Sequence, residues 1–234
     1  GVNAVGTGIY NEMKNYGTLK DALAQNQELK DQIAQLTEDN NRLQAEQFEL
    51  DRLRQLYELD QEYMQYNKIG ARVIARDSEK WFQVFRINKG SADGVAVDMN
   101  VVADGGLVGI VTDVGANYAT VRSIIDDSNR VGAMKLDSSY TCIVAGDLTL
   151  YEEGRLKLTD FSKDAQIRDG DQIVTSNISS KFLPGILIGY ASDVTIDPDH
   201  LTQSGYLIPI ADFDNLQEVL IITDIKDTGE AAAQ

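Results

Sequence analysis

Cysteine, histidine, tryptophan and proline are scarce in this chain, whose 234 residues include one cysteine, one histidine, one tryptophan and three prolines. A single cysteine, Cys142, excludes an internal disulfide and any zinc site built from several cysteines. Cys142 lies in the apolar run YTCIVAG, where we expect a buried thiol that packs as a small hydrophobic side chain. The cysteine content does not decide between the cytosol and a bacterial exterior, because a low content suits both compartments.

Long apolar runs are also lacking, and none approaches the roughly 18 residues of a membrane-spanning helix. The chain has no initiator Met and no signal-peptide pattern, so we expect a shortened or processed chain. Positively charged residues are outnumbered: the chain has 21 Lys and Arg residues and 37 Asp and Glu residues, for a net charge of −16. This imbalance disfavours nucleic acids and anionic lipid surfaces as partners, because both are bound by clustered Lys and Arg.

Glycine and proline are absent from residues 18–69, between Gly17 and Gly70. Apolar residues in this stretch follow a 3,4 spacing, which predicts a left-handed coiled-coil helix over 18–69. The predicted dimer seam consists of Leu19, Ala22, Asn26, Leu29, Ile33, Leu36, Asn40, Leu43 and Leu50.

Two asparagines in the seam indicate how the helices would pair. Asn26 and Asn40 occupy the first position of their heptads, where a buried Asn is tolerated when it meets another Asn across a parallel, in-register dimer. The alternative is an amphipathic helix that lies on its own domain. The apolar stripe is narrow, with polar Lys30, Thr37 and Gln44 beside it, and this favours the parallel two-stranded coiled coil.

Beyond Arg72 the hydrophobic period changes to two, and glycine becomes frequent. The stretch NKGSADGVAVDMNVVADGGLVGIV (88–111) reads as short strands joined by Asp-Gly and Gly-Gly turns, which is typical of an all-β barrel or sandwich. We assign turn-forming or strand-bending roles to Gly90, Gly94, Gly105, Gly106, Gly109, Gly185 and Gly189. No helix follows these glycines, which excludes phosphate-binding and dinucleotide-binding loops.

A weak internal similarity predicts two barrels. MNVVADGGLVGIV (99–111) and DQIVTSNISSKFLPGILIGYA (171–191) each pair a short apolar strand with a second strand that carries two glycines. We therefore expect a first barrel over 70–147, a second over 148–225 and a flexible tail over 226–234. Whether the last strand, EVLIIT, returns to the first barrel is left open.

The order of these segments resembles the extracytoplasmic part of the MreC family of rod-shape-determining proteins. The resemblance rests on the coiled coil, INKGSADGV (87–95), GLVGIV (106–111), SIIDDSNRVGA (123–133) and IVTSNISSKFLPGILIGYASDV (173–194). One departure is Ser176-Asn177 in place of an expected Ser-Gly, where Asn would tolerate the left-handed conformation of the turn.

The resemblance implies a protein on the extracytoplasmic face of a bacterial membrane, with a single-pass anchor absent from this chain and residues 1–17 as a juxtamembrane linker. It also implies two β-barrels and a coiled-coil homodimer. The implied partners are MreD, a class B penicillin-binding transpeptidase and its glycosyltransferase. The implied role is a non-enzymatic scaffold of the peptidoglycan-elongating machinery that controls cell shape.

Enzymatic chemistry finds little support in the sequence, and we predict no catalytic, cofactor or metal site. His200 lies near Asp197 and Asp199, but no serine has the glycine-rich turn of an oxyanion hole. Asp193, Asp197 and Asp199 lack the further oxygen donors and the pivot glycine of a calcium loop. Trp81 and Phe82 lie in a strand that is apolar on both faces, so we expect core residues and not a sugar platform.

Two other function classes remain as alternatives to the scaffold. A divergent trypsin-like hydrolase would use His200, and loss of activity in a His200→Ala variant would reveal it. An efflux-adaptor type of envelope protein also joins a coiled coil to β-domains, but it needs a second helix that runs back along the first. The sequence contains one such helical stretch.

Overall fold

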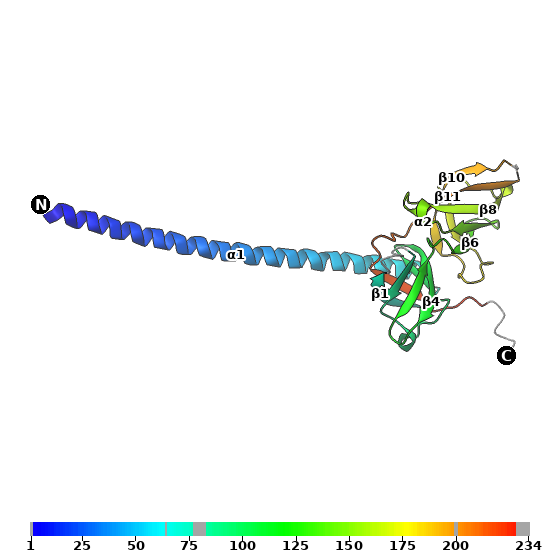
Figure 1. Ribbon diagram of the computed structural model, residues 1–234, viewed down its shortest axis with the longest axis horizontal. Coiled ribbons are helices and arrows are strands. Elements are labelled where there is room, and N and C mark those ends of the chain that lie inside the picture. Colours follow the sequence, from blue (N-terminus) through cyan, green and yellow to red (C-terminus); the bar gives the residue numbers. More distant parts are fainter. Residues whose placement is uncertain (1, 64, 77–82, 199–200, 228–234) are drawn as a thin grey trace. The chain divides into compact units, whose positions relative to one another are not determined.

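The computed structural model describes residues 2–63, 65–76, 83–198 and 201–227 (Figure 1). The chain divides into two units, Gly1–Leu53 and Arg54–Gln234. The first unit is helical, and the second contains the end of the same helix and all of the strands. Among the described residues, no helix combines the length and apolar character needed to cross a membrane.

The long helix α1 runs over Val2–Glu62. Its start corrects the boundary expected at Thr18, because Gly17 and the glycines before it do not interrupt the helix. Glycine inside a helix costs only about 1 kcal/mol relative to alanine, and the first 62 residues contain no proline. The helix also ends earlier than the expected residue 69, since strand β1 already begins at Lys68.

The second unit holds two closed barrels of six antiparallel strands each, which confirms the predicted pair of β-barrels. In the first barrel the strands follow the order β1-β12-β3-β4-β5-β2 around the ring. Their bounds are Lys68–Arg76 for β1, Val84–Ile87 for β2, Asn100–Ala103 for β3, Gly106–Val114 for β4, Ala119–Ser123 for β5 and Glu218–Ile222 for β12. A short 3-10 helix, η1 (Ser91–Asp93), precedes β3.

The second barrel follows the order β10-β11-β8-β7-β6-β9. Its bounds are Arg130–Lys135 for β6, Thr141–Ala145 for β7, Leu156–Ser162 for β8, Gln172–Thr175 for β9, Leu187–Ile196 for β10 and Thr202–Pro209 for β11. Two short helices, α2 (Leu148–Tyr151) and η2 (Lys163–Ala165), lie in its connections.

The strand assignment corrects the boundary that we expected between residues 147 and 148. Strands β6 and β7 belong to the second barrel, and the last strand, β12, returns to close the first barrel between β1 and β3. The turn from Gly146 to Gly154 lies within the second barrel. Strands of both barrels have similar length and spacing, so the sequence pattern marks this turn without revealing to which barrel its strands belong.

The two barrels share one cyclic order, which explains the internal similarity of the sequence. When β3, β4 and β5 are matched to β9, β10 and β11, the remaining strands also match, and β12 takes the place of β6. Gly109 and Gly189 occupy corresponding strands. A Cβ atom at Gly109 would lie 2.2 Å from the carbonyl oxygen of Arg122, and one at Gly189 would lie 2.1 Å from that of Ile208. Glycine at these positions lets the neighbouring strand approach closely.

Both barrels are filled by aliphatic and aromatic side chains, including Ile87, Leu107 and Phe161. Cys142 is buried with 1% of its surface exposed, as expected. Burial raises the pKa of its thiol to about 12. The thiol therefore stays protonated at neutral pH and packs as a hydrophobic group.

Candidate coiled-coil interface

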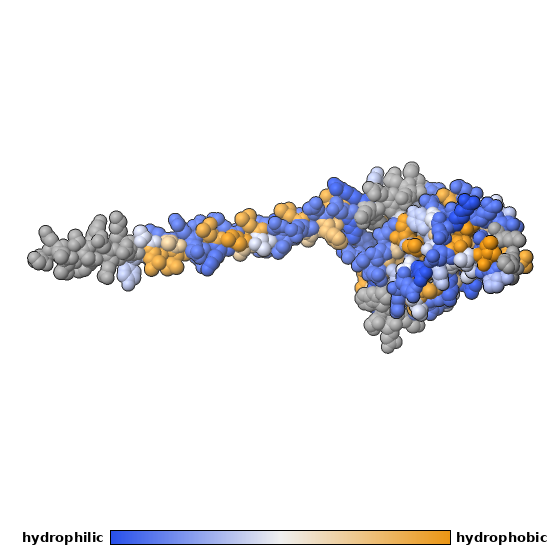
Figure 2. Space-filling view, turned by 90° about the horizontal axis from the view of Figure 1, so that it is seen from above, coloured by the Kyte–Doolittle hydropathy of each residue, from blue (hydrophilic) through white to orange (hydrophobic). Residues whose placement is uncertain are grey.

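The predicted dimer seam lies on the surface of α1. Its large apolar members are all strongly exposed, with 56% for Leu29, 62% for Ile33, 68% for Leu36 and 58% for Leu43. Figure 2 shows hydrophobic residues recurring along the helix between hydrophilic ones. Such a regular stripe of exposed leucine is costly in water, and it is the usual signature of a helix that packs against another helix.

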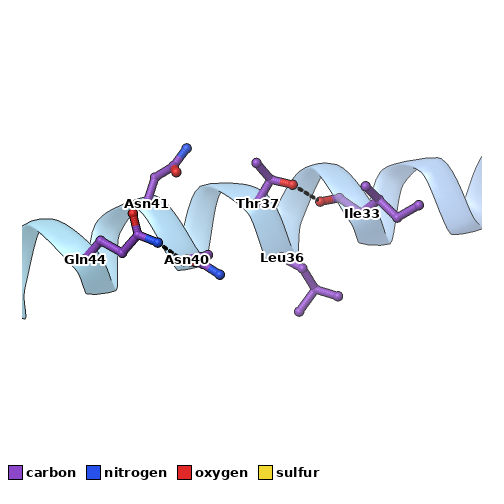
Figure 3. Close-up of a pocket in the computed structure, with 6 residues that line it drawn as sticks. All are labelled: Ile33, Leu36, Thr37, Asn40, Asn41 and Gln44. Atoms are coloured by element: carbon purple, nitrogen blue, oxygen red, sulfur yellow. Dashed lines mark hydrogen bonds between the residues drawn. The ribbon is translucent and has the colours of Figure 1, made fainter.

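A shallow groove of about 450 Å³ marks the middle of this seam. In Figure 3, Leu36 extends from one side of the helix, and Thr37 and Asn41 extend from the opposite side. The groove is lined by Ile33, Leu36, Thr37, Asn40, Asn41 and Gln44. In a coiled coil, a groove bounded by residues of two successive turns is the hole that receives a side chain of the facing helix.

Polar groups around this groove make hydrogen bonds within the helix. Gln44 Nε2 donates to Asn40 Oδ1 over 2.8 Å, and the Thr37 hydroxyl donates to the carbonyl oxygen of Ile33 over 2.7 Å. The bond to Gln44 uses one acceptor site of Asn40 and leaves its Nδ2 donors, so the amide can still bond to a matching amide on a facing helix.

Charged and polar side chains also pair between successive turns of the helix. Arg42 lies 3.1 Å from Asp39 and 3.8 Å from Glu46, and Gln27 Nε2 donates to Asp31 over 2.9 Å. These exposed contacts stabilise the helix by a few tenths of a kcal/mol each, roughly 0.2–0.5. Their position leaves the apolar stripe clear of charged side chains.

Several exposed apolar residues of α1 lie outside the predicted seam, among them Leu23 and Phe48. Leu23 is 63% exposed and directly follows Ala22, so it widens the stripe at a point where the seam residue itself is small. Phe48 is 62% exposed and stacks with Arg52, whose guanidinium carbon lies 5.9 Å from the ring centroid. Leu23 could have been found by inspecting the positions beside the seam, whereas Phe48 is expected from the sequence to widen the apolar face near the end of the helix.

The candidate catalytic and metal residues do not form a site in the described part of the chain. Asp197 accepts hydrogen bonds from the hydroxyls of Thr202 and Ser204, and Asp193 accepts one from Arg155 Nη1 over 3.3 Å. Over the described ranges, no three metal-binding side chains come together. His200, Asp199, Trp81 and Phe82 lie outside the described residues.

The substitution at Asn177 also differs from expectation. Asn177 is not among the non-glycine residues with positive φ, so the left-handed conformation that we expected it to tolerate is not used. The left-handed residue of this connection is Gly185, with φ of +82°.

Comparisons with known proteins agree with this architecture. The family "Rod shape-determining protein MreC, barrel core" matches residues 73–223. The chain is 31% identical to the cell shape-determining protein MreC of Listeria monocytogenes over 215 residues, which are 90% of this chain and 72% of the relative. It is 30% identical to MreC of Bacillus subtilis over 220 residues, with 89% and 75% covered.

Solved structures give the same result. MreC of Listeria monocytogenes superimposes with a TM-score of 0.63 at 30% identity, covering 88% of this chain and all of that chain. MreC of Pseudomonas aeruginosa gives 0.60 at 24% identity, covers 67% and 99%, and shows the fold alone. The relatives from Listeria monocytogenes and Bacillus subtilis are both named as cell shape-determining proteins. The chain belongs to the MreC family of rod shape-determining proteins.

Proposed function

We propose that this chain is a non-enzymatic scaffold whose two copies join through a parallel, in-register coiled coil of α1. The observation that carries the proposal is the stripe of exposed leucine and isoleucine interrupted by Asn26 and Asn40. A parallel in-register pair brings each asparagine opposite its own copy, where the two amides can bond to each other. Any shift of one helix by a single heptad would set Asn40 against Ile33.

The energy of burial supports such a dimer. Leu29, Ile33, Leu36, Leu43 and Leu50 are each about half or more exposed in the single chain. Because only about half of each side chain is exposed, burying ten of them, five from each helix, gains roughly half of 1.5–3 kcal/mol each, which is of the same size as an association cost of roughly 4–15 kcal/mol. The two asparagine pairs oppose this term, and they select one register at the expense of stability.

The proposed partners of the barrels belong to the peptidoglycan-elongating machinery. One chain of a solved complex between the penicillin-binding protein PBP2 and MreC from Helicobacter pylori superimposes on this chain with a TM-score of 0.50 at 12% identity. By analogy, we propose a class B penicillin-binding transpeptidase, its glycosyltransferase and MreD as partners of this chain. The net charge of −16 disfavours nucleic acid as a ligand on electrostatic grounds.

The proposal puts the barrels on the extracytoplasmic face of a bacterial membrane, tethered by a segment N-terminal to this chain. A related MreC structure, 24% identical, is described as a major periplasmic domain. In this arrangement the coiled coil of α1 joins two chains, so that two pairs of barrels lie together at the membrane. The barrels supply the surfaces that bind the partners.

Sedimentation equilibrium tests the dimer. The wild-type chain should behave as a dimer of 25.8 kDa subunits, and the double variant Leu29→Asp/Leu36→Asp should become monomeric. Ala24→Asp/Ala45→Asp adds the same charge on the side of the helix away from the seam, and it should leave the dimer intact. A wild-type chain that stays monomeric at high micromolar concentration would refute the proposal.

Partner binding is tested separately with an immobilised class B transpeptidase ectodomain. We expect it to retain the wild-type chain, and also the monomeric seam variant with a lower apparent affinity, because two linked barrel pairs bind with avidity. Absence of binding by the wild-type chain would contradict the scaffold role for this partner without affecting the dimer.

A further inference from the structure

The segment that follows α1 makes hydrogen bonds to both barrels. Tyr63 comes directly after the helix and is 5% exposed. Its hydroxyl donates to the carbonyl oxygen of Gly105 in the first barrel over 3.0 Å, and it accepts from the backbone N–H of Leu187 in the second barrel over 3.1 Å. One phenol oxygen therefore connects the two barrels.

Two further side chains strengthen this connection. The hydroxyl of Tyr66 donates to the carbonyl oxygen of Pro184 over 2.7 Å. The backbone N–H of the next residue, Asn67, donates to Oδ2 of Asp224, which follows β12 of the first barrel, over 2.8 Å. Burial and the nearby Asp224 carboxylate raise the pKa of Tyr66, so the phenol keeps its proton and remains a donor.

The two barrels also approach each other closely at Gly106. A Cβ atom on Gly106 would lie 2.2 Å from Cγ2 of Ile210 and 3.1 Å from the carbonyl oxygen of Leu187. Gly106 begins β4 and Leu187 begins β10, which are matching strands of the two barrels. The corresponding corners of the two barrels, between β3 and β4 and between β9 and β10, thus meet around Tyr63.

We infer that Tyr63 is a positioning residue that fixes the arrangement of the two barrels. We call Tyr63, Tyr66 and Gly106 the barrel joint. Two covalent connections, residues 124–129 and 210–217, already link the barrels, but a connection along the chain does not by itself fix how two packed units are turned relative to each other. The barrel joint acts beside the buried Asn100, which bonds to Lys181 and Leu183 of the second barrel, and together they limit this freedom, so that the two barrels present one composite surface to a partner. The inference concerns a single chain and does not depend on the dimer or on the identity of the partner.

The distance between the barrels provides a direct test. Spin labels on cysteines at Val97 in the first barrel and Tyr140 in the second, which are 46% and 47% exposed, report this distance. Cys142→Ala removes the native thiol, and dilution with unlabelled chain keeps the measured distance within one molecule. The variant Tyr63→Phe deletes only the bridging hydroxyl. The matched control Tyr118→Phe deletes the hydroxyl of a surface tyrosine whose ring stacks with Arg86.

We expect a single narrow distance distribution in the wild-type chain and in Tyr118→Phe, and a broadened or shifted distribution in Tyr63→Phe. Measurements well below each unfolding midpoint distinguish positioning from stability. If Tyr63→Phe lowers the midpoint but keeps the wild-type distribution, Tyr63 is only a structural residue and the inference is wrong.

A second variant covers the case in which Tyr63→Phe does not fold. Gly106→Ala places a methyl group against Ile210 and leaves every tyrosine in place, so it should displace the barrels and shift the distribution. Tyr66→Phe should broaden it to a smaller extent. Unchanged distributions in both of these folded variants would overturn the inference.

Discussion

Oδ1 of Asn100 accepts a hydrogen bond from the backbone N–H of Leu183 over 2.8 Å, which ties the start of β3 to the loop before β10. Asn100 is fully buried, and its Nδ2 also donates to the carbonyl oxygen of Lys181 over 3.1 Å. This one amide therefore satisfies a donor and an acceptor of the opposite barrel. Lys181 adds a surface ion pair with Asp98 at 3.1 Å.

Replacing Asn100 by alanine should destabilise the chain substantially. The change leaves the N–H of Leu183 and the carbonyl of Lys181 without their partner, and each lost buried hydrogen bond costs about 1–3 kcal/mol. Urea unfolding should show this loss for Asn100→Ala, whereas Asn177→Ala at an exposed position should remain within about 0.5 kcal/mol of the wild type. Equal stability of the two variants would contradict the assigned role of Asn100.

The final strand should be essential to the first barrel. β12 pairs with β1 on one side and β3 on the other, and its residues from Val219 to Ile222 are buried. A chain that ends at Gln217 exposes two strand edges and loses much of the core. We expect limited proteolysis to cleave its residues 68–123 rapidly, while a control chain that ends at Asp227 resists. Resistance of the shorter chain would show that the barrel closes without β12.

Glycine substitutions should have opposite effects in the two units. Gly109→Ala and Gly189→Ala each force a methyl group against a strand carbonyl, and overpacking of this kind costs typically about 1–3 kcal/mol. Gly17 lies in α1, where an added Cβ atom would meet nothing within 4 Å, so Gly17→Ala should stabilise the helix by about 1 kcal/mol. Thermal unfolding followed by circular dichroism measures both. A stabilising effect at Gly109 or Gly189 would refute the close approach.

Alkaline pH should weaken the second barrel through Cys142. The pKa of its thiol rises from 9.0 to about 12 on folding. A raised pKa contributes stability that is complete below pH 9 and is lost as the pH rises towards 12. The free energy of unfolding should therefore fall over this window, and Cys142→Ala should reduce the slope. A thiol reagent at pH 8 should label Cys142 only after unfolding, and rapid labelling of the folded chain would contradict its burial.

Much of this architecture could be predicted from local patterns. The leucine spacing of residues 19–50 predicts the helix, and the short strands joined by Asp-Gly and Gly-Gly turns predict the all-β part of the chain. The helix start at Val2 was missed because Gly17 reads as a boundary, although a single glycine costs too little to end a long helix. The barrel boundary was misplaced because a glycine-rich turn looks the same within a barrel and between two barrels.

The contacts between the barrels could not be predicted from the sequence. Tyr63 reads as one more apolar residue at the end of a helix, and Asn100 reads as a polar residue before a strand. Their partners, Leu187 and Leu183, lie more than 80 residues away in the chain. Hydrogen bonds between such distant segments depend on the closure of both barrels, which no local pattern encodes.

Disulfide cross-linking at position 40 tests the central claim, the parallel in-register pairing of α1, most directly. In a Cys142→Ala background, Asn40→Cys should oxidise readily to a covalent dimer, because a parallel in-register pair places the two cysteines opposite each other. Ala45→Cys, on the far side of the helix, should stay monomeric under the same conditions. Failure of Asn40→Cys to cross-link, or equal cross-linking at both positions, would contradict the account.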